Sequence, residues 1–162
     1  MVKIKIPKNI VVALTKVAIK VTGPFGTVIK EKSNNILLHR TTNYIYVLGG
    51  QGLELLKKLF RGTSKGYVRK LKIVGVEFKV NVGNSFLNLR LGLSHEINYK
   101  IPRNIKIYNP RPRLLVIVGY DERVVSQIAA EIRSLKLPEP YKGKGILYFE
   151  EMPLRKEGKK AN

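Results

Sequence analysis

The side chains best suited to chemistry lie near the end of this chain, in residues 138–145, Pro-Glu-Pro-Tyr-Lys-Gly-Lys-Gly. Two prolines favour an extended backbone and prevent a helix from continuing. Lys142 and Lys144 alternate with two glycines, whose lack of a side chain lets the backbone approach another surface closely. Tyr141 offers a flat ring that can stack on a base or a ribose. The pattern favours contact with a polyanion, and a solvated linker leading into a disordered tail is the alternative interpretation.

No set of side chains in the sequence is typical of an enzyme. Asp121 is the only aspartate, and its place before a predicted helix suits a helix cap. His39 and His95 have no Asp, Cys or second His at ligand spacing, which argues against a metal site. The Gly-Lys-Gly at 143–145 lacks the upstream glycine and the following Ser or Thr of a phosphate-binding loop. We therefore expect a non-enzymatic protein without cofactor, metal or small-molecule substrate.

The net charge narrows the class of partner. The chain carries 31 Lys and Arg against 11 Asp and Glu, a formal net charge of +20. Solubility alone requires only about 2–8 net charges in a small domain, so the excess indicates a polyanionic partner. Nucleic acid is the commonest such partner, and an anionic membrane surface is the alternative. The longest aliphatic run, 114–118, is far shorter than the roughly 20 residues of a membrane span.

Residues 1–68 are predicted to form a first α+β domain. Short apolar runs between turn signals predict strands at 4–6, 10–14, 17–21, 27–29, 36–38 and 44–48. A helix is predicted over 51–60, because one face gathers Leu53, Leu56, Leu59 and Phe60. The polar, glycine-bearing segment 62–66 is expected to be a turn, which places the domain boundary before Arg69.

Residues 69–137 are predicted to form a second α+β domain, followed by an extended basic tail over 138–162. Strict alternation predicts two strands, at 76–82 and 87–93, that pair antiparallel about a turn, with a bulge at Gly75 upstream. Further strands are expected at 97–101, 105–108 and 114–118, with a loop at 109–112. A helix after Asp121 is predicted to end before Pro138 and to bury Val125, Ile128, Ala129 and Ile132, with Leu135 extending this stripe.

The two halves contain a weak internal repeat. Residues 6–10, Ile-Pro-Lys-Asn-Ile, resemble residues 101–105, Ile-Pro-Arg-Asn-Ile, and an apolar strand ending in glycine follows each, at Gly23 and Gly119. A duplicated α+β module with antiparallel or mixed sheets and one main helix per copy is the simplest explanation. Chance similarity between two five-residue segments is the alternative.

Four segments of the chain resemble one protein family. The C-terminal stretch 138–145, with Arg133 before it and Tyr148, Glu150 and the basic tail after it, is similar to the C-terminal signature of bacterial-type ribosomal large-subunit protein six. Segments 71–76 and 91–95 resemble two further parts of this family and occur in the family's order and spacing. Segment 21–26 resembles the equivalent turn in the family's first domain. The resemblance is specific over 69–160 and looser over 1–68.

The resemblance implies both a fold and a function. Members have two similar α+β domains, bind large-subunit rRNA mainly through the second domain and tail, and lie near the sarcin–ricin loop and stalk base. Neighbouring large-subunit proteins and translation factors are therefore expected nearby. Carried over by position, the strongest RNA-binding candidates are Tyr141, Lys142, Gly143, Lys144, Gly145, Arg155, Lys156, Lys159 and Lys160. Two weaker candidates are Ser94 and His95.

This chain also departs from the family pattern. Glu77 stands where the family generally has glycine, Leu93 and Glu96 replace a usual Phe and Pro, and the segment before Arg69 is short. Such drift is expected in an organellar ribosome, above all a mitochondrial one, with the bacterial cytoplasm as the alternative. We therefore expect a structural constituent of a large ribosomal subunit, and a free RNA-binding or regulatory module as the second hypothesis.

Overall fold

The computed structural model describes residues 2–31, 37–48, 50–154 and 156–157. They form an α+β protein that divides into two compact units, so the fold class expected from the sequence is confirmed. The first unit holds residues 1–67 and 119–122, and the second holds 68–118 and 123–162. No pattern in the sequence indicated that the short segment 119–122 belongs with the first unit.

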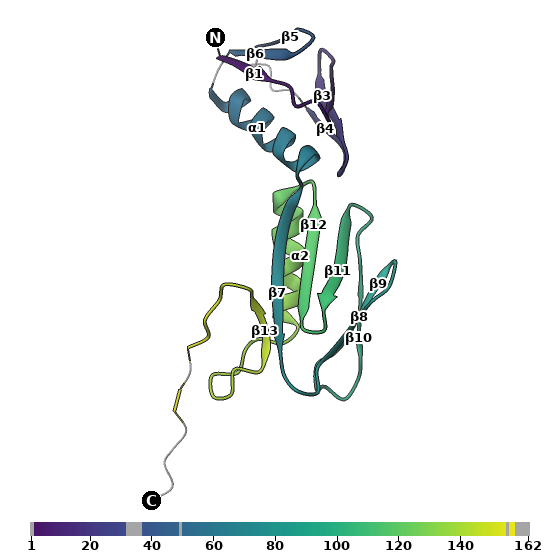
Figure 1. The fold of residues 1–162 in the computed structure, drawn as a ribbon, viewed down its shortest axis with the longest axis vertical. Helices are drawn as coiled ribbons and strands as arrows, with labels where there is room; N and C mark the ends of the chain where they lie inside the picture. Colours follow the sequence, from purple (N-terminus) through teal and green to yellow (C-terminus); the bar gives the residue numbers. More distant parts are fainter. Residues whose placement is uncertain (1, 32–36, 49, 155, 158–162) are drawn as a thin grey trace, which may run out of the picture. The chain divides into compact units, whose positions relative to one another are not determined.

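The first unit consists of two three-stranded sheets and one helix (Figure 1). One sheet has the order β1 (Val2–Lys5), β6 (Tyr44–Leu48), β5 (Leu37–Arg40), and the other has the order β2 (Val11–Leu14), β3 (Ala18–Gly23), β4 (Gly26–Glu31). All neighbouring strands are antiparallel. Helix α1 (Gly50–Ser64) packs against β3, β4 and β6. The most deeply buried core side chains are Val12, Ile19, Val21, Ile45, Val47 and Leu56.

Helix α1 is longer than predicted, and the turn expected at 62–66 is wrong for its first three residues. Gly62 lies against the carbonyl of Tyr120, where an added Cβ would be 2.0 Å from the oxygen. Thr63 is buried, and its hydroxyl donates to the Leu59 carbonyl at 2.7 Å, so the helix satisfies it internally. The helix ends at Ser64, and Gly66 just beyond it has φ +73° and donates its N–H to the Arg61 carbonyl.

The second unit contains a four-stranded sheet with the order β11 (Ile105–Arg111), β12 (Leu114–Gly119), β7 (Tyr67–Val74), β13 (Gly145–Tyr148). Helix α2 (Glu122–Ser134) lies along one face of this sheet (Figure 1). It buries Val125, Ile128, Ala129 and Ile132 as predicted, whereas Leu135 lies beyond the helix and is half-buried. A three-stranded sheet has the order β10 (Ile97–Lys100), β9 (Phe86–Arg90), β8 (Lys79–Val82), and its antiparallel β8–β9 pair is also confirmed.

Two local predictions in this unit are wrong. The strand expected from residue 76 begins only at Lys79, and Val76 is 83% exposed. Residues 75–78 turn instead, and the Phe78 ring lies over Gly75, where an added Cβ would be 2.6 Å from it. The loop expected at 109–112 is largely strand, because β11 continues to Arg111. A proline inside β11 is tolerated because β11 is an edge strand.

The tail expected over 138–162 is partly folded. Residues 145–148 form β13, which pairs antiparallel with β7 in the register Ile146↔Ile73 and Leu147↔Lys72. Ile146 and Leu147 are both buried. Burial of these two side chains stabilises the strand as part of the sheet, since about 25 cal/mol is gained per Å² of apolar surface removed from water.

The repeat found in the sequence has the same geometry in both units. In residues 6–10 the Ile10 N–H donates to the Pro7 carbonyl at 3.2 Å, and in 101–105 the Ile105 N–H donates to the Pro102 carbonyl at 3.0 Å. Each turn leads into a strand, β2 or β11, that neighbours a six-residue strand ending in glycine, β3 or β12. This shared turn and strand pair support duplication over chance similarity.

A Gly62→Ala substitution tests the reason for the glycine in α1. Alanine is the better helix former by about 1 kcal/mol, so helix propensity alone favours the variant. Because the added carbon would clash with the Tyr120 carbonyl, we expect instead a loss of about 1–3 kcal/mol in the free energy of unfolding, measured by urea denaturation. Lys57→Ala, at an exposed position of the same helix, is the control. A Gly62→Ala protein as stable as the wild type would contradict the explanation.

Candidate nucleic-acid interface

The stretch 138–145 forms a closed loop and not the extended segment expected from its prolines. The Gly143 N–H donates to the Glu139 carbonyl, and the Glu139 N–H donates to the Lys144 carbonyl, both at 2.9 Å. Gly143 has φ +67°, a backbone conformation that other residues adopt at a cost. These two bonds tie the ends of the loop together.

The two glycines of the loop are buried. A Cβ added to Gly145 would lie 2.6 Å from Pro138 Cα and 2.7 Å from the Leu137 carbonyl oxygen. The backbone at Gly145 therefore packs closely against its own chain. Contact of Gly143 and Gly145 with RNA stays a prediction.

Among the predicted RNA contacts in the loop, Tyr141, Lys142 and Lys144 have exposed side chains. Lys156 is exposed as well. Its N–H donates to the Pro140 carbonyl at 2.8 Å, so the chain returns to the loop after β13. The structure thus brings these four exposed residues and the two glycines, six of the predicted RNA-binding residues, into one region.

The other predicted residues are not part of this cluster. Ser94 and His95 are exposed in the segment between β9 and β10, and among the described residues no bond links them to the loop. Three further candidates lie outside the described residues: Arg155, Lys159 and Lys160.

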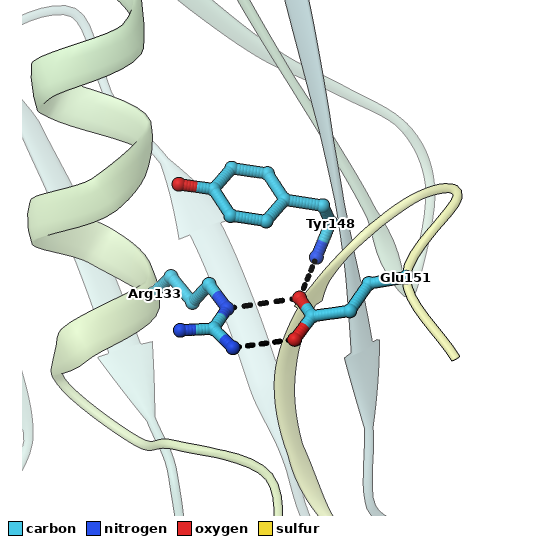
Figure 2. Close-up of polar contacts among 3 residues, drawn as sticks. All are labelled: Arg133, Tyr148 and Glu151. Atoms are coloured by element: carbon cyan, nitrogen blue, oxygen red, sulfur yellow. Dashed lines mark hydrogen bonds and ion pairs between the residues drawn. The ribbon is translucent and has the colours of Figure 1, made fainter. Parts of the chain in front are cut away.

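An ion pair at the base of the loop joins α2 to the segment after β13 (Figure 2). Arg133, near the end of α2, donates from Nε to Glu151 Oε2 at 2.9 Å, and its Nη2 pairs with Oε1. The Tyr148 N–H also donates to Oε2, at 3.0 Å. The Arg133 guanidinium lies 5.5 Å from the centre of the Tyr148 ring. We call Arg133 and Glu151 the clamp; sequence reasoning quoted Arg133 only for its resemblance and missed Glu151.

The clamp is charged at neutral pH. The hydrogen bonds from Arg133 hold the pKa of the Glu151 carboxyl below its usual range, although desolvation raises it. The same bonds raise the pKa of the Arg133 guanidinium. The two side chains are only 26% and 25% exposed, so solvent screens their attraction less than that of a fully exposed pair.

A cleft of about 210 Å³ lies beside the loop and adds two basic residues that sequence reasoning missed. Lys72 and Arg113 are exposed at its rim. Arg113 is held there because its carbonyl accepts the Ile73 N–H at 2.9 Å. The alternation of apolar and polar residues along β7 could have indicated that Lys72 faces outward. Its position near the loop could not have been predicted in this way, because it depends on the pairing of β7 with β13. The cleft is lined by Lys72, Ile73, Val74, Arg113, Gly143, Leu147, Glu151 and Pro153.

This geometry is suited to holding phosphate groups and offers little for catalysis. The family described as Ribosomal protein L6 matches residues 74–149, from the end of β7 to the end of β13. A protein named large ribosomal subunit protein uL6 from Xanthobacter autotrophicus is 39% identical over 97% of this chain and 95% of its own length. This chain belongs to the ribosomal protein L6 family.

Other members of the family are similarly related to the chain. A uL6m protein from Reclinomonas americana is 38% identical, covering 98% of this chain and 96% of its own length. A uL6 protein from Mycoplasma capricolum is 40% identical, covering 99% and 91%. Bacterial members and a mitochondrial-type member thus match nearly the whole chain at similar identity.

Family membership decides the question of catalysis. The ribosomal protein L6 family consists of structural proteins, so this member is a ribosomal protein and not an enzyme, as the sequence predicted. Among the described residues no cluster of three or more His, Cys, Asp or Glu could hold a metal ion. No helix in the described part of the chain is long and apolar enough to cross a membrane.

The lowered pKa of Glu151 leads to a pH dependence of stability. A carboxyl whose pKa is lower in the folded state stabilises the fold above its ordinary pKa, and this contribution is lost as the pH falls through the folded value. Replacing Glu151 with Gln removes the titration. We therefore expect the wild type to exceed Glu151→Gln in stability by about 1 kcal/mol near neutral pH, and this advantage to shrink as the pH falls below the ordinary glutamate pKa of about 4.3.

Chemical denaturation at a series of pH values measures this difference. Glu150→Gln removes the same charge from the exposed neighbouring position, and it should follow the wild-type curve. A difference between wild type and Glu151→Gln that does not change with pH would show that the ion pair contributes no electrostatic stabilisation.

Proposed function

We propose that this protein is a structural constituent of the large ribosomal subunit, held in place by large-subunit rRNA. The relatives that match it over nearly its whole length carry the name large ribosomal subunit protein. The net charge of +20 provides the electrostatic basis, because Lys and Arg that neutralise phosphates release counterions from the nucleic acid. Function in translation follows from the place of the protein in the subunit.

The observation that carries the proposal is the arrangement of cations on a hydrogen-bonded loop. Lys142 and Lys144 are exposed on a backbone closed by two hydrogen bonds, and Lys156 is attached to the same loop. Tyr141, at 57% exposure, is available for stacking on a base. Contacts of this kind fix position and orientation on RNA, and they carry little sequence information.

The finer location rests on the family resemblance. It supports a location of the second unit near the sarcin–ricin loop and the base of the stalk, where we expect translation factors and neighbouring large-subunit proteins. A free RNA-binding or regulatory module is the alternative function. Sedimentation through a sucrose gradient separates the two, since a subunit constituent follows the large subunit through a high-salt wash and a free module stays at the top.

We also propose a mitochondrial ribosome as the compartment, with the bacterial cytoplasm as the alternative. The departures at Glu77, Leu93 and Glu96 favour an organellar lineage, and a uL6m relative matches 98% of the chain. Immunoblotting of ribosomes purified from mitochondria of the source cell should find the protein with the large subunit. A source cell without mitochondria, or detection only in cytoplasmic ribosomes, would contradict the proposal.

A double substitution in the loop tests the RNA contact. We expect Lys142→Ala with Lys144→Ala to weaken binding to an in vitro transcript of the rRNA domain that carries the sarcin–ricin loop. If each lysine neutralises one phosphate, the slope of log K against log salt concentration should become shallower by about 1.5. Filter binding at several KCl concentrations measures both quantities, and circular dichroism confirms that the fold is intact.

The matched control is Lys57→Ala with Lys58→Ala, which removes the same charge from exposed positions of α1. We expect this pair to change affinity and salt slope less than the loop pair does. Equal effects of the two double variants would mean that only the overall charge matters, and the loop would not be the binding site.

A further inference from the structure

We infer that Arg133 and Glu151 are positioning residues that hold the loop in its RNA-binding conformation before RNA arrives. The inference deepens the proposed function and rests on it. Neither residue is among the predicted RNA contacts, and their charges are directed at each other.

The clamp lies where two connections to the loop meet. On one side, α2 ends at Ser134, and the Lys136 carbonyl accepts the Ile146 N–H at 2.9 Å, which fixes the start of β13 beside the entry to the loop. On the other side, the chain leaves β13, is bound by the clamp at Glu151, and returns to the loop at Pro140 through Lys156. The Arg133–Glu151 pair therefore connects the end of α2, which leads into the loop, to the segment that returns to the loop after β13.

Few other bonds hold the segment after β13. Within the described part of the chain, the Phe149 N–H donates to the Lys70 carbonyl and the Glu151 N–H donates to the Tyr148 carbonyl, both at 3.0 Å, and Lys156 donates to Pro140. Lys70 Nζ also lies 5.6 Å from the centre of the Phe149 ring. Met152 and Leu154, which lie between Glu151 and Lys156, are 93% and 92% exposed, so burial of apolar side chains adds little stability to this segment. Loss of the clamp should therefore let this segment and the attached loop sample more conformations.

Greater freedom in the unbound loop lowers apparent affinity without removing any contact. A protein whose competent conformation is only partly populated binds more weakly by that fraction, because ordering of the loop must then accompany binding. The number of phosphates neutralised in the complex stays the same. A positioning role is thus distinguished by a weaker Kd at an unchanged salt slope.

Arg133 has a second effect through charge. Glu151 lines the same cleft as Lys72, Arg113 and Gly143 of the loop. An unpaired carboxylate at this place would repel the phosphates that the lysines attract, and the guanidinium cancels its charge. Removal of Arg133 should therefore weaken RNA binding more than removal of Glu151.

Four variants of the full chain separate these effects, with the rRNA transcript described above as the probe. Glu151→Gln removes the clamp together with the acidic charge, and Arg133→Gln removes the clamp but leaves the charge. The double variant Arg133→Gln with Glu151→Gln removes both partners. Glu150→Gln is the control, since it deletes one carboxylate from the exposed neighbouring position.

We expect Glu151→Gln to raise Kd by about three- to tenfold at an unchanged salt slope, and Arg133→Gln to raise it further. The double variant should be close to Glu151→Gln, because no unpaired carboxylate remains. Glu150→Gln should bind at least as tightly as the wild type. In hydrogen exchange the amides of Gly143 and Lys156 should exchange faster in all clamp variants, while Leu115 and Ile117 in the buried strand β12 keep wild-type rates.

The outcomes distinguish this inference from the proposed function. If Lys142→Ala with Lys144→Ala weakens binding but Glu151→Gln does not, the loop binds RNA and the positioning role is wrong. If the lysine pair has no effect, the proposed site itself fails. A salt slope reduced by Glu151→Gln would also overturn the inference, since the clamp would then alter the phosphate contacts themselves. If Glu151→Gln also changes the exchange rates of the sheet amides, Arg133→Lys takes its place, because it keeps the charge but loses the two-pronged geometry. Arg133→Lys must then show the same weaker Kd and faster exchange of the loop amides.

Discussion

The basic loop depends on one ion pair, between Arg133 of α2 and Glu151 beyond β13. The pair lies at an edge of the sheet, where β13 is only four residues long and has one strand neighbour, β7. A two-pronged guanidinium–carboxylate contact has both the strength and the directionality needed to fix two segments. The bond from the Tyr148 N–H to Glu151 and the packing of Arg133 over the Tyr148 ring tie the same pair to the strand.

This arrangement explains how a very basic chain can present a defined surface. A flexible lysine-rich tail would also attract rRNA, but it would lose conformational entropy on binding. Here the backbone of the loop is already closed by its own hydrogen bonds, and its glycines serve close packing within the unit. Arg133 is the cation used for internal structure, and the exposed lysines of the loop remain for phosphate. Folding of the second unit thus also fixes the positions of the exposed lysines of the loop.

Sequence patterns predicted the features that depend on neighbouring residues. The buried stripe of α2 and the antiparallel β8–β9 pair follow from local periodicity, and both are found. The patterns failed where the deciding partner is distant in sequence. Gly62 was predicted to lie in a turn, but it is a helix residue that packs against Tyr120. Residues 145–148 were predicted to belong to an extended tail, but they form a strand that pairs with β7. Glu151 is one of several acidic residues near the end, and only the fold brings it to Arg133.

The central claim is that ribose-phosphate backbone holds this protein in place through the loop. Its most direct test is a residue-level map of protein–RNA crosslinks in assembled large subunits. We expect crosslinks from Tyr141, Lys142, Lys144 and Lys156 to converge on one region of large-subunit rRNA. Crosslinks that come only from the first unit, or a loop that crosslinks to no RNA while the subunit is intact, would contradict the claim.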